Sequence, residues 1–341
     1  MTPREIIKRI IEFDNPPRIG YDFQYGYYSD IVGINLKMKD EEKLNWQKPE
    51  YFKESFPQYK DFDGFLKLDE FGNLYGKMSH DLTGGGEVLV GVLDSWDDLD
   101  DYVLPDFDNP ERYSHLYSRV EENKDKFLSG WIMGFPFSFM RKMRKMENFL
   151  MDLILEKENV IKLRDRMTNM IIGMIENYGK LGVDSVFFCE DWGVQDRLLI
   201  NPELWREIFK PSYAILCETA RKHNIKVMMH SCGYIYEILE DLIEVGVDVL
   251  QLDQPSLMGL ENLAEIISGK VTLYSSVDIQ EVLPTGDKKL IEEHAIKMVE
   301  LFHKNGGFIA KDYGDYRTIQ VSEQSAQIMR EKFFELGKRP V

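Results

Sequence analysis

The chain has 341 residues, a formal net charge of −17 at pH 7 and a hydrophobic fraction of 43%. This hydrophobic fraction is enough for a packed core and argues against disorder. The negative charge argues against nucleic acid as a partner, and against a polyanionic substrate unless a local basic pocket exists.

The chain contains three cysteines, Cys189, Cys217 and Cys232. Three scattered thiols do not build a disulfide framework, so we expect a reducing, cytoplasmic setting. The segment 1–13 is charged and lacks the apolar core of a signal peptide, and no apolar run is long enough to span a membrane. We therefore expect a cytoplasmic protein with no membrane partner.

The first third of the chain, 1–110, contains few regular elements. Four isoleucines at helical spacing predict a helix over 3–13, and residues 18–23 predict a short strand. The stretch 35–110 is dense in charged and aromatic residues, with only short strand-like pieces. We interpret it as an elaboration at the entrance of a larger fold, not as a separate domain.

From residue 111 onward, strands and helices alternate with short loops. The predicted strands are 127–133, 184–190, 225–230, 247–252, 271–275 and 307–310. The predicted helices are 111–126, 140–155, 158–181, 202–223, 235–245, 260–268, 288–305 and 321–337. This alternation favours parallel strands joined by right-handed crossovers.

Together with the early strand, this pattern predicts an α/β fold, a closed eight-stranded TIM-type barrel formed by one domain over 1–341, with 1–110 irregular and 111–341 regular. A doubly wound open sheet is the alternative. No Gly-x-Gly-x-x-Gly motif follows the first strand, which weakens a dinucleotide-binding interpretation.

Polar residues follow five consecutive predicted strands. They are Glu190 and Asp191, His230 and Cys232, Asp253 and Gln254, Asp278 and Gln280, and Asp312 and Tyr313. In a parallel barrel such residues face one shared pocket. Any one of them could be a loop cap, but five in succession predict an acidic cleft that holds one histidine and one thiol.

His230 and Cys232 stand two apart, so both side chains leave the same face of an extended strand and could form half a zinc site. A buried cysteine is otherwise often a small apolar core residue. Cys189 and Glu190 point to opposite faces, and we expect Glu190 to face the pocket. Trp192 could form a roof over the pocket. Trp131 could supply an apolar wall or pack in the core.

Several motifs of this chain resemble the uroporphyrinogen decarboxylase superfamily. They are Leu181-Gly182-Val183-Asp184, Glu190-Asp191-Trp192-Gly193, His230-Ser231-Cys232-Gly233, residues 242–248 and Gly306-Gly307-Phe308-Ile309. The resemblance is clear from about residue 147 to the C-terminus and weaker before it. It implies one of two activities. One is metal-free decarboxylation of a tetrapyrrole, and the other is zinc-dependent transfer of methyl groups between a corrinoid and another acceptor.

The zinc methyltransferase branch fits this chain better. The decarboxylases carry an Arg-rich N-terminal motif, whereas segment 16–23 here has one arginine followed by an acid and aromatics. A pocket lined with Asp and Glu should repel an octacarboxylate. The zinc methyltransferases use a His-x-Cys pair, as at His230 and Cys232. They take a further cysteine from the loop after the last strand, where this chain has Tyr313.

This departure leaves the third metal ligand open. The resemblance implies that an acid (Glu190, Asp191 or Asp312) or Tyr313 completes the site, or that the metal has been lost. Replacing sulfur by oxygen would make zinc more Lewis acidic, which suits an ether oxygen. We expect metal ligation by His230, Cys232 and Glu190 or Asp312.

The functional residues that we expect fall into two groups. The catalytic groups are Glu190, Asp191, Asp278 and Tyr313, and the residues of the substrate pocket are Asp22, Tyr25, Trp192 and Gln254.

The resulting hypothesis is a corrinoid-dependent methyltransferase with one zinc per chain. It would act on a small methylated compound, such as a methoxylated aromatic, with cobalamin carried by a partner protein. The alternatives are a tetrapyrrole decarboxylase, with Asp191 or Asp22 holding a pyrrole N–H, and a non-catalytic barrel that binds a small ligand or a corrinoid. A dimer is compatible with the resemblance.

Overall fold

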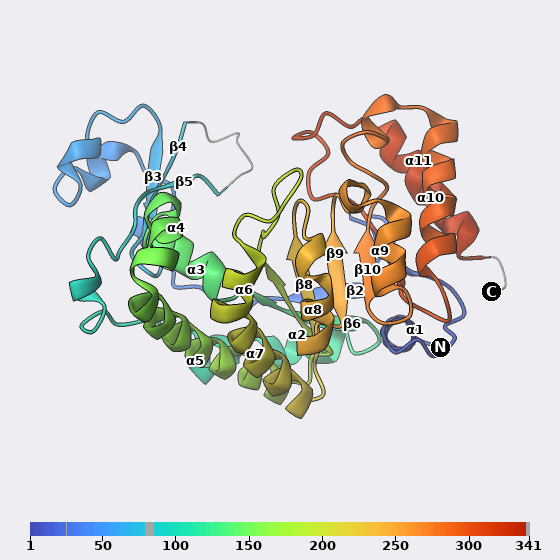
Figure 1. The fold of residues 1–341 in the computed structure, drawn as a ribbon, viewed down its shortest axis with the longest axis horizontal. Helices are drawn as coiled ribbons and strands as arrows, with labels where there is room; N and C mark the ends of the chain where they lie inside the picture. Colours follow the sequence, from blue (N-terminus) through green and yellow to red (C-terminus); the bar gives the residue numbers. More distant parts are fainter. Residues whose placement is uncertain (25, 79–84, 339–341) are drawn as a thin grey trace.

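The computed structural model describes residues 1–24, 26–78 and 85–338 (Figure 1). Its centre is an eight-stranded sheet in which every neighbouring pair is parallel. The strands are β1 (Gly20–Asp22), β2 (Ile31–Ile34), β6 (Phe127–Ile132), β7 (Ser185–Cys189), β8 (Lys226–Ser231), β9 (Val249–Leu252), β10 (Thr272–Ser275) and β11 (Phe308–Lys311). Their order is β1-β11-β10-β9-β8-β7-β6-β2.

The two end strands, β1 and β2, meet at Asp30. The backbone N–H of Asp30 donates to the carbonyl of Tyr21 at 2.7 Å, and the Asp30 carboxylate accepts the N–H of Tyr21 at 2.9 Å. Arg18 forms an ion pair with the same carboxylate at 2.7 Å. The sheet is therefore a nearly closed barrel, and the predicted TIM-type fold is confirmed.

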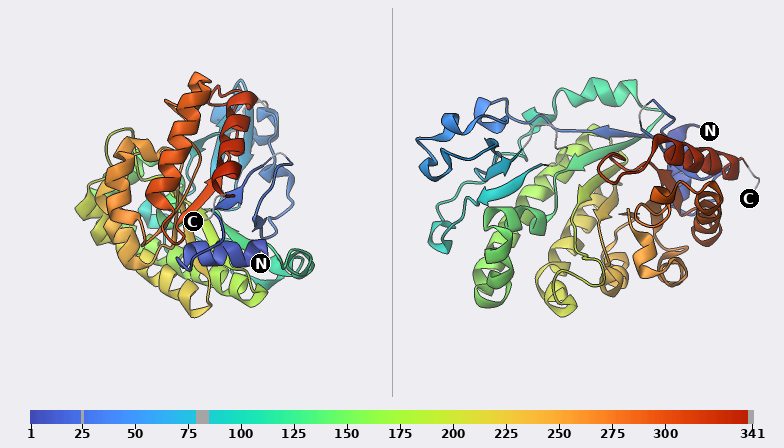
Figure 2. Two further views of the ribbon diagram at one scale, coloured as in Figure 1. Left: turned by 90° about the vertical axis from the view of Figure 1, so that its right-hand side faces the viewer. Right: turned by 90° about the horizontal axis from the view of Figure 1, so that it is seen from above.

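Helices surround the barrel. They are α1 (Pro3–Ile11), α2 (Leu116–Glu122), α3 (Pro136–Met143), α4 (Met146–Leu155), α5 (Lys157–Leu181), α6 (Pro202–Ile208), α7 (Lys210–Lys222), α8 (Leu239–Val245), α9 (Leu260–Ile267), α10 (Lys288–Phe302) and α11 (Glu323–Leu336). Seen from above, the helices coloured green to red form an arc outside the strands (Figure 2). Along the chain these helices alternate with the strands, as the sequence predicts for residues 111–341.

Two of the predicted helices are each divided in two. The helix predicted over 140–155 breaks at Lys145, which has a φ of 60° between α3 and α4. The helix predicted over 202–223 breaks at Phe209, between α6 and α7. Pro211 stands in the first turn of α7, where its missing N–H disrupts no helical bond.

Helix α1 covers the amino end of the barrel. Its four isoleucines are buried and pack in one cluster with residues at the start of several strands, including Phe127 and Val249. Thr2 and Glu5 form a capping box at its first turn, which fixes where the helix begins. Among the described residues, α1 therefore closes the amino end of the barrel and leaves the carboxyl end of the strands for a site.

A small antiparallel sheet lies beside that open end (Figure 1). Its strands are β3 (Phe65–Leu68), β4 (Leu74–Lys77) and β5 (Glu87–Val90). Leu66 and Leu74 on one face pack against Phe52 in a separate small core, while Lys67 and Tyr75 pair across the other face. None of the helices that the structure describes is long and apolar enough to cross a membrane.

Candidate active site and metal centre

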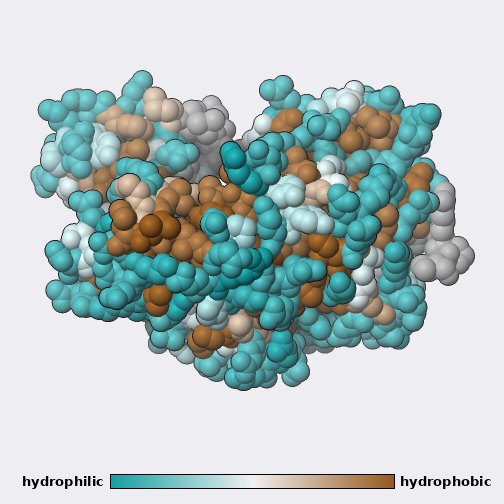
Figure 3. Space-filling model, viewed as in Figure 1, coloured by the Kyte–Doolittle hydropathy of each residue, from teal (hydrophilic) through white to brown (hydrophobic). Residues whose placement is uncertain are grey.

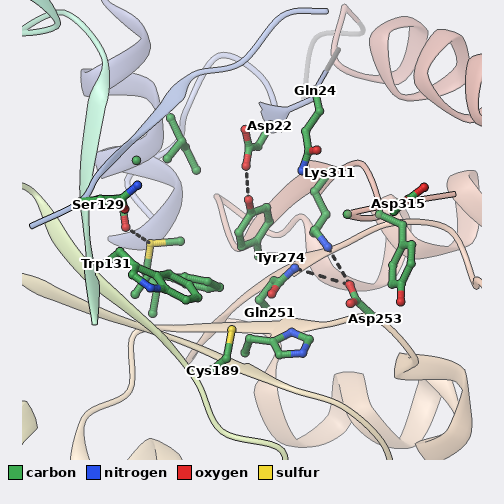
Figure 4. Close-up of a pocket in the computed structure, with 18 of the residues that line it drawn as sticks. Asp22, Gln24, Ser129, Trp131, Cys189, Gln251, Asp253, Tyr274, Lys311 and Asp315 are labelled. Carbon is green, nitrogen blue, oxygen red and sulfur yellow. Dashed lines mark hydrogen bonds and ion pairs between the residues drawn. The ribbon is translucent and has the colours of Figure 1, made fainter. Parts of the chain in front are cut away.

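A cavity of about 920 Å³ occupies the carboxyl end of the barrel (Figure 4). Its floor is apolar and comes from three neighbouring strands. Trp131 on β6 pairs with Phe187 on β7, and Phe187 pairs with Met228 on β8. The Trp131 and Phe187 rings lie 5.4 Å apart between centroids, and together they offer a broad aromatic surface to the cavity.

A polar layer lies above this floor. Cys189, His230, Gln251 and Tyr274 follow one another in register across β7, β8, β9 and β10, and all four line the cavity. Cys189 and His230 stand two residues beyond the floor residues of their own strands, and Gln251 and Tyr274 lie in register with them. Because side chains alternate along a strand, all four point to the same side as the floor. The barrel therefore changes from apolar to polar toward its mouth.

Two hydrogen-bonded pairs complete the wall nearest the mouth. Lys311 on β11 forms an ion pair with Asp253 at 2.7 Å, with 7% and 9% of their side chains exposed. The hydroxyl of Tyr274 donates to Asp22, whose other oxygen accepts from Ser29 at 2.7 Å. Both pairs are visible in Figure 4.

Three side chains that could hold a metal ion converge at the mouth. Nε2 of His230 lies 3.2 Å from Sγ of Cys232 and 3.4 Å from Oδ1 of Asp191. One ligand atom from each residue lies within 4.8 Å of the other two. The backbone N–H of Cys232 donates to the same Asp191 oxygen at 3.0 Å, which fixes the carboxylate beside the histidine.

The positive charge of His230 and the negative charge of Asp191 stabilise each other. Burial lowers the pKa of His230, but its hydrogen bonds with Asp191 and Cys232 outweigh burial and raise the pKa to about 10. Burial raises the pKa of Asp191, but the hydrogen bond and charge of His230, the N–H of Cys232 and the charge of Arg141 together outweigh burial and lower the pKa to about 2. Without a metal, the pair is therefore an imidazolium beside a carboxylate.

The donor set fits zinc. Zinc takes nitrogen, thiolate and carboxylate ligands at about 2.0–2.3 Å, which in tetrahedral geometry places neighbouring ligand atoms roughly 3.4–3.6 Å apart. The separations from His230 Nε2 to the two other atoms are 3.2 and 3.4 Å. A metal ion would displace the proton from Nε2, because metal ligation requires the neutral imidazole.

Glu190 faces away from the cavity, so the expectation that it points inward is wrong. It is fully buried behind β7, where it accepts hydrogen bonds from the hydroxyl of Tyr213 and from the N–H of Ser138 at 2.9 Å. Ser138 is in the first turn of α3, a position that favours a carboxylate. Burial raises the pKa of Glu190 to about 7. Cys189 takes the inward position, and burial raises its pKa to about 12.

Trp192 does not form a roof over the pocket. Its side chain is fully buried between the barrel and the outer helices, where its Nε1 donates to Tyr213 at 2.9 Å and its ring lies 4.1 Å from that of Phe137. Trp131, for which the sequence left a wall or a core position open, lines the cavity. The aromatic surface of the site therefore comes from strands β6 and β7.

Three further expected site residues have structural partners outside the cavity. Asp312 is fully buried in an ion pair with Arg330 at 2.8 Å. The Asp278 carboxylate accepts the N–H groups of Gln280 and Glu281, and the Gln254 side chain accepts the N–H of Gly233 at 2.9 Å. None of the three lines the cavity, so this structure lends no support to the expected roles of Asp312 as a metal ligand, Asp278 as a catalytic group and Gln254 as a pocket residue.

Asp22 and Tyr313 do line the cavity, as expected, and Tyr25 lies outside the described residues. Sequence reasoning missed Phe187, Tyr274 and Lys311. The local sequence of β7 offers no signal that could have found Phe187, because Phe187 and Phe188 are both apolar. Lys311 ends the strand Phe308-Ile309-Ala310-Lys311, and a lysine that closes a wholly buried strand is a signal for a polar interior.

Fold and site together define an α/β barrel with a three-residue centre, suited to a metal ion, at the mouth of its cavity. The sequence model of the uroporphyrinogen decarboxylase (URO-D) family matches residues 83–311. The chain therefore belongs to the URO-D family.

A solved structure agrees on the fold. A methyltransferase from Methanosarcina mazei is similar with a TM-score of 0.58 and 15% sequence identity, covering 80% of this chain and 75% of that one. A D-psicose 3-epimerase from Clostridium cellulolyticum H10 shares 11% identity with a TM-score of 0.43, covering 71% of this chain and 84% of that one. No curated protein matches the chain.

Proposed function

We propose that the protein is the methyltransferase component of a corrinoid-dependent system. The observation that carries the proposal is the convergence of Asp191, His230 and Cys232 at the edge of a cavity with an aromatic floor. Membership of the URO-D family and the likeness of the fold to a Methanosarcina methyltransferase support it.

Zinc is the metal that we propose for this centre. Three protein ligands leave a fourth position open, which is the arrangement of catalytic and not of structural zinc sites. When bound there, zinc supplies a Lewis acid at the edge of the cavity. Asp191 in place of a second thiolate makes the ion harder, which favours an oxygen atom of the substrate over a sulfur atom.

The cavity residues suit a methoxylated aromatic compound. Trp131 and Phe187 would hold the ring, because offset aromatic stacking adds about 0.5–1.5 kcal/mol to the burial of apolar area. Since the floor lies one layer below His230, a ring seated there directs a substituent toward the mouth. Asp22, Tyr274 and Lys311 would bind polar substituents on the opposite wall.

The reaction exchanges one bond for another. A corrinoid on a partner would supply cobalt(I) as the methyl acceptor, so that the carbon–oxygen bond of the methyl ether would be exchanged for a bond from carbon to cobalt and the departing oxygen would take up one proton. Tyr313 lines the cavity, and burial raises the pKa of its hydroxyl. It therefore stays protonated at neutral pH and would donate a hydrogen bond to that oxygen.

The corrinoid would arrive on a partner protein at the barrel mouth. In the space-filling view a notch separates the part around β3–β5 from the part around α10 and α11, and the surface around α10 and α11 is largely hydrophilic (Figure 3). A polar, open rim suits a partner that binds and leaves in each cycle.

The test is methylation of reduced cobalamin by a panel of methyl donors under anaerobic conditions, followed by its absorption spectrum. We expect formation of methylcobalamin from one or more methoxylated aromatics with zinc-loaded protein, and at least a tenfold lower rate with Cys232→Ala. The variant Gln195→Ala, at an exposed loop position, serves as the control and should match the wild type. No methylation of any corrinoid by zinc-loaded protein would refute the proposal.

Decarboxylation of a tetrapyrrole or of a smaller acid is the second candidate, and the family description favours it. It requires no metal, so an assay with uroporphyrinogen in the presence of a chelator separates the two. Product with fewer carboxyl groups under chelator would support decarboxylation. Tight binding of a ligand without turnover in either assay would support a non-catalytic barrel.

A further inference from the structure

A second cavity, of about 230 Å³, lies between the small sheet and helix α3. Lys67 and Tyr75 of the sheet and Lys142 of α3 line it. Met133, two residues beyond Trp131, lines it as well, so it lies farther along the same chain segment than the main cavity. The second cavity shares no lining residue with the metal centre.

Two ammonium groups face this space, and none of the carboxylates that the structure describes contacts either of them. The ammonium group of Lys142 makes no hydrogen bond or ion pair within residues 1–24, 26–78 and 85–338, and burial lowers its pKa. Lys67 lies 4.8 Å from the ring of Trp46 and 5.6 Å from that of Tyr75, and burial lowers its pKa too. Its closest contacts are therefore aromatic faces.

The carboxylates that line the cavity already have other partners. Asp69 accepts the N–H of Asn73 at 2.9 Å, the side-chain amide of Asn73 at 2.8 Å and the hydroxyl of Tyr75 at 3.1 Å. Glu70 is paired with Arg112 at 2.6 Å. Two ammonium groups are thus set against one carboxylate that no guanidinium neutralises, which leaves one positive charge in excess.

We propose that this cavity binds an oxyanion, either a carboxylate or a phosphate group, between Lys142 and Lys67. Burying an ammonium group without a partner is unfavourable, and an oxyanion would supply charge-assisted hydrogen bonds. Phe71, Phe107 and Phe139 form the apolar part of the lining, and the low dielectric that they provide strengthens such bonds. In a chain with a net charge of −17, a built cationic pocket is a specific feature.

Two different molecules could supply the same oxyanion group. It is either a free small anion or the anionic arm of a molecule seated in the main cavity. Neither depends on methyl transfer, because binding can be measured without metal, corrinoid or turnover. A failure of the methyltransferase proposal therefore leaves this one standing, and the reverse also holds.

The test is isothermal titration calorimetry of the full chain with inorganic phosphate, acetate, 3-methoxybenzoate and anisole, at constant ionic strength set with sodium chloride. The variants are Lys142→Met and Lys67→Gln, with the exposed Lys289→Gln on α10 as the matched control. We expect at least tenfold weaker anion binding in the two cavity variants and unchanged binding in the control.

The probes separate the sources. Binding of phosphate or acetate that depends on Lys142 supports a free anion. Binding of 3-methoxybenzoate that depends on Lys142, with no binding of phosphate or acetate, supports an anionic arm, and anisole should then bind equally to wild type and variant. Binding that is the same in Lys142→Met as in the wild type for every probe, or saturable binding of none, overturns the proposal.

Thermal melting in anion-free buffer shows whether weaker anion binding by a variant results from a loss of folded protein. Lys142→Met should melt at or above the temperature of the wild type, because it removes an ammonium group that no anion contacts. A fall of about 5 °C or more would mean that Lys142 and Asp69 form a structural ion pair, and this would overturn the proposal as well.

Discussion

Oδ1 of Asp191 lies 3.4 Å from Nε2 of His230, and the same oxygen accepts the backbone N–H of Cys232 at 3.0 Å. A carboxylate that is already hydrogen-bonded beside an imidazole loses little conformational freedom when a metal binds. In the proposed zinc site, Asp191 would take the place of the further cysteine that the family resemblance implies. This relationship leads to the first prediction.

Removal of either residue should release the metal. Protein purified without a histidine tag should contain about one zinc per chain by elemental analysis, His230→Ala should contain none, and Asp191→Ala should bind zinc at least tenfold more weakly. Glu190→Gln is the matched control, because Glu190 lies on the opposite face of the same strand, and it should retain the metal. Equal zinc content in all four proteins would contradict the assignment.

Substitution of the two tryptophans near the site should have different effects, mainly on stability for Trp192 and mainly on substrate binding for Trp131. Trp192→Ala should lower the free energy of unfolding by about 3–5 kcal/mol, because it empties a fully buried aromatic cluster. Trp131→Ala, at the cavity wall, should cost less stability and should raise KM for an aromatic donor. Urea unfolding together with steady-state kinetics measures both. Trp192→Ala that raised KM without a loss of stability would argue for a pocket role after all.

The ion pair of Asp312 with Arg330 should be structural. Side-chain exposures of 0% and 1% mean that Arg330→Met leaves a buried carboxylate unpaired, at a cost of about 3–5 kcal/mol in urea unfolding. Arg317→Met, whose side chain is 84% exposed beside Asp315, is the control and should cost about 0–1 kcal/mol. Zinc content should not change in either variant. Loss of zinc in Asp312→Asn would restore Asp312 as a ligand.

His303 should make stability depend on pH. Burial lowers its pKa below the unfolded value of about 6.5, so the unfolded chain takes up this proton first as the pH falls. The stability is complete above that value and declines as the pH drops toward the lower folded pKa. Between about pH 7.5 and about pH 5.5, the free energy of unfolding should therefore fall more for the wild type than for His303→Leu.

The exposed His115 provides the comparison for this experiment. His115→Leu should follow the wild type over the whole pH range in urea unfolding. If His303→Leu also followed the wild type, His303 would not be the group responsible.

The sequence predicts the barrel well because apolar periodicity and turn residues determine the alternation of strands and helices. It misses β2, because Ile31–Ile34 has one fully buried residue, Ile34, and an exposed glycine, and so carries no clear strand pattern. Hydrogen bonds to β6 form this strand, and pairing of that kind cannot be inferred from four residues alone.

The site shows a different limit. Strand alternation leaves two choices at the end of β7. In one, Glu190 and Trp192 face inward. In the other, Cys189 and Asp191 do, and a one-residue slip exchanges the whole set. The structure takes the second choice, because Cys189 lies in register with His230 and Glu190 is held by Tyr213. The local sequence Phe187-Phe188-Cys189-Glu190 has no alternation that could have decided between them.

The capped helix α1 has a consequence for the order of events in catalysis. With the amino end of the barrel sealed by the isoleucines of α1, the entrance that the described residues leave to the main cavity lies at the carboxyl end of the strands. If the proposed corrinoid-bearing partner docks across that entrance, the donor would have to enter first, and the demethylated product would leave only after the partner departs. An excess of partner protein should then slow turnover, because the docked partner would block both entry of the donor and release of the product.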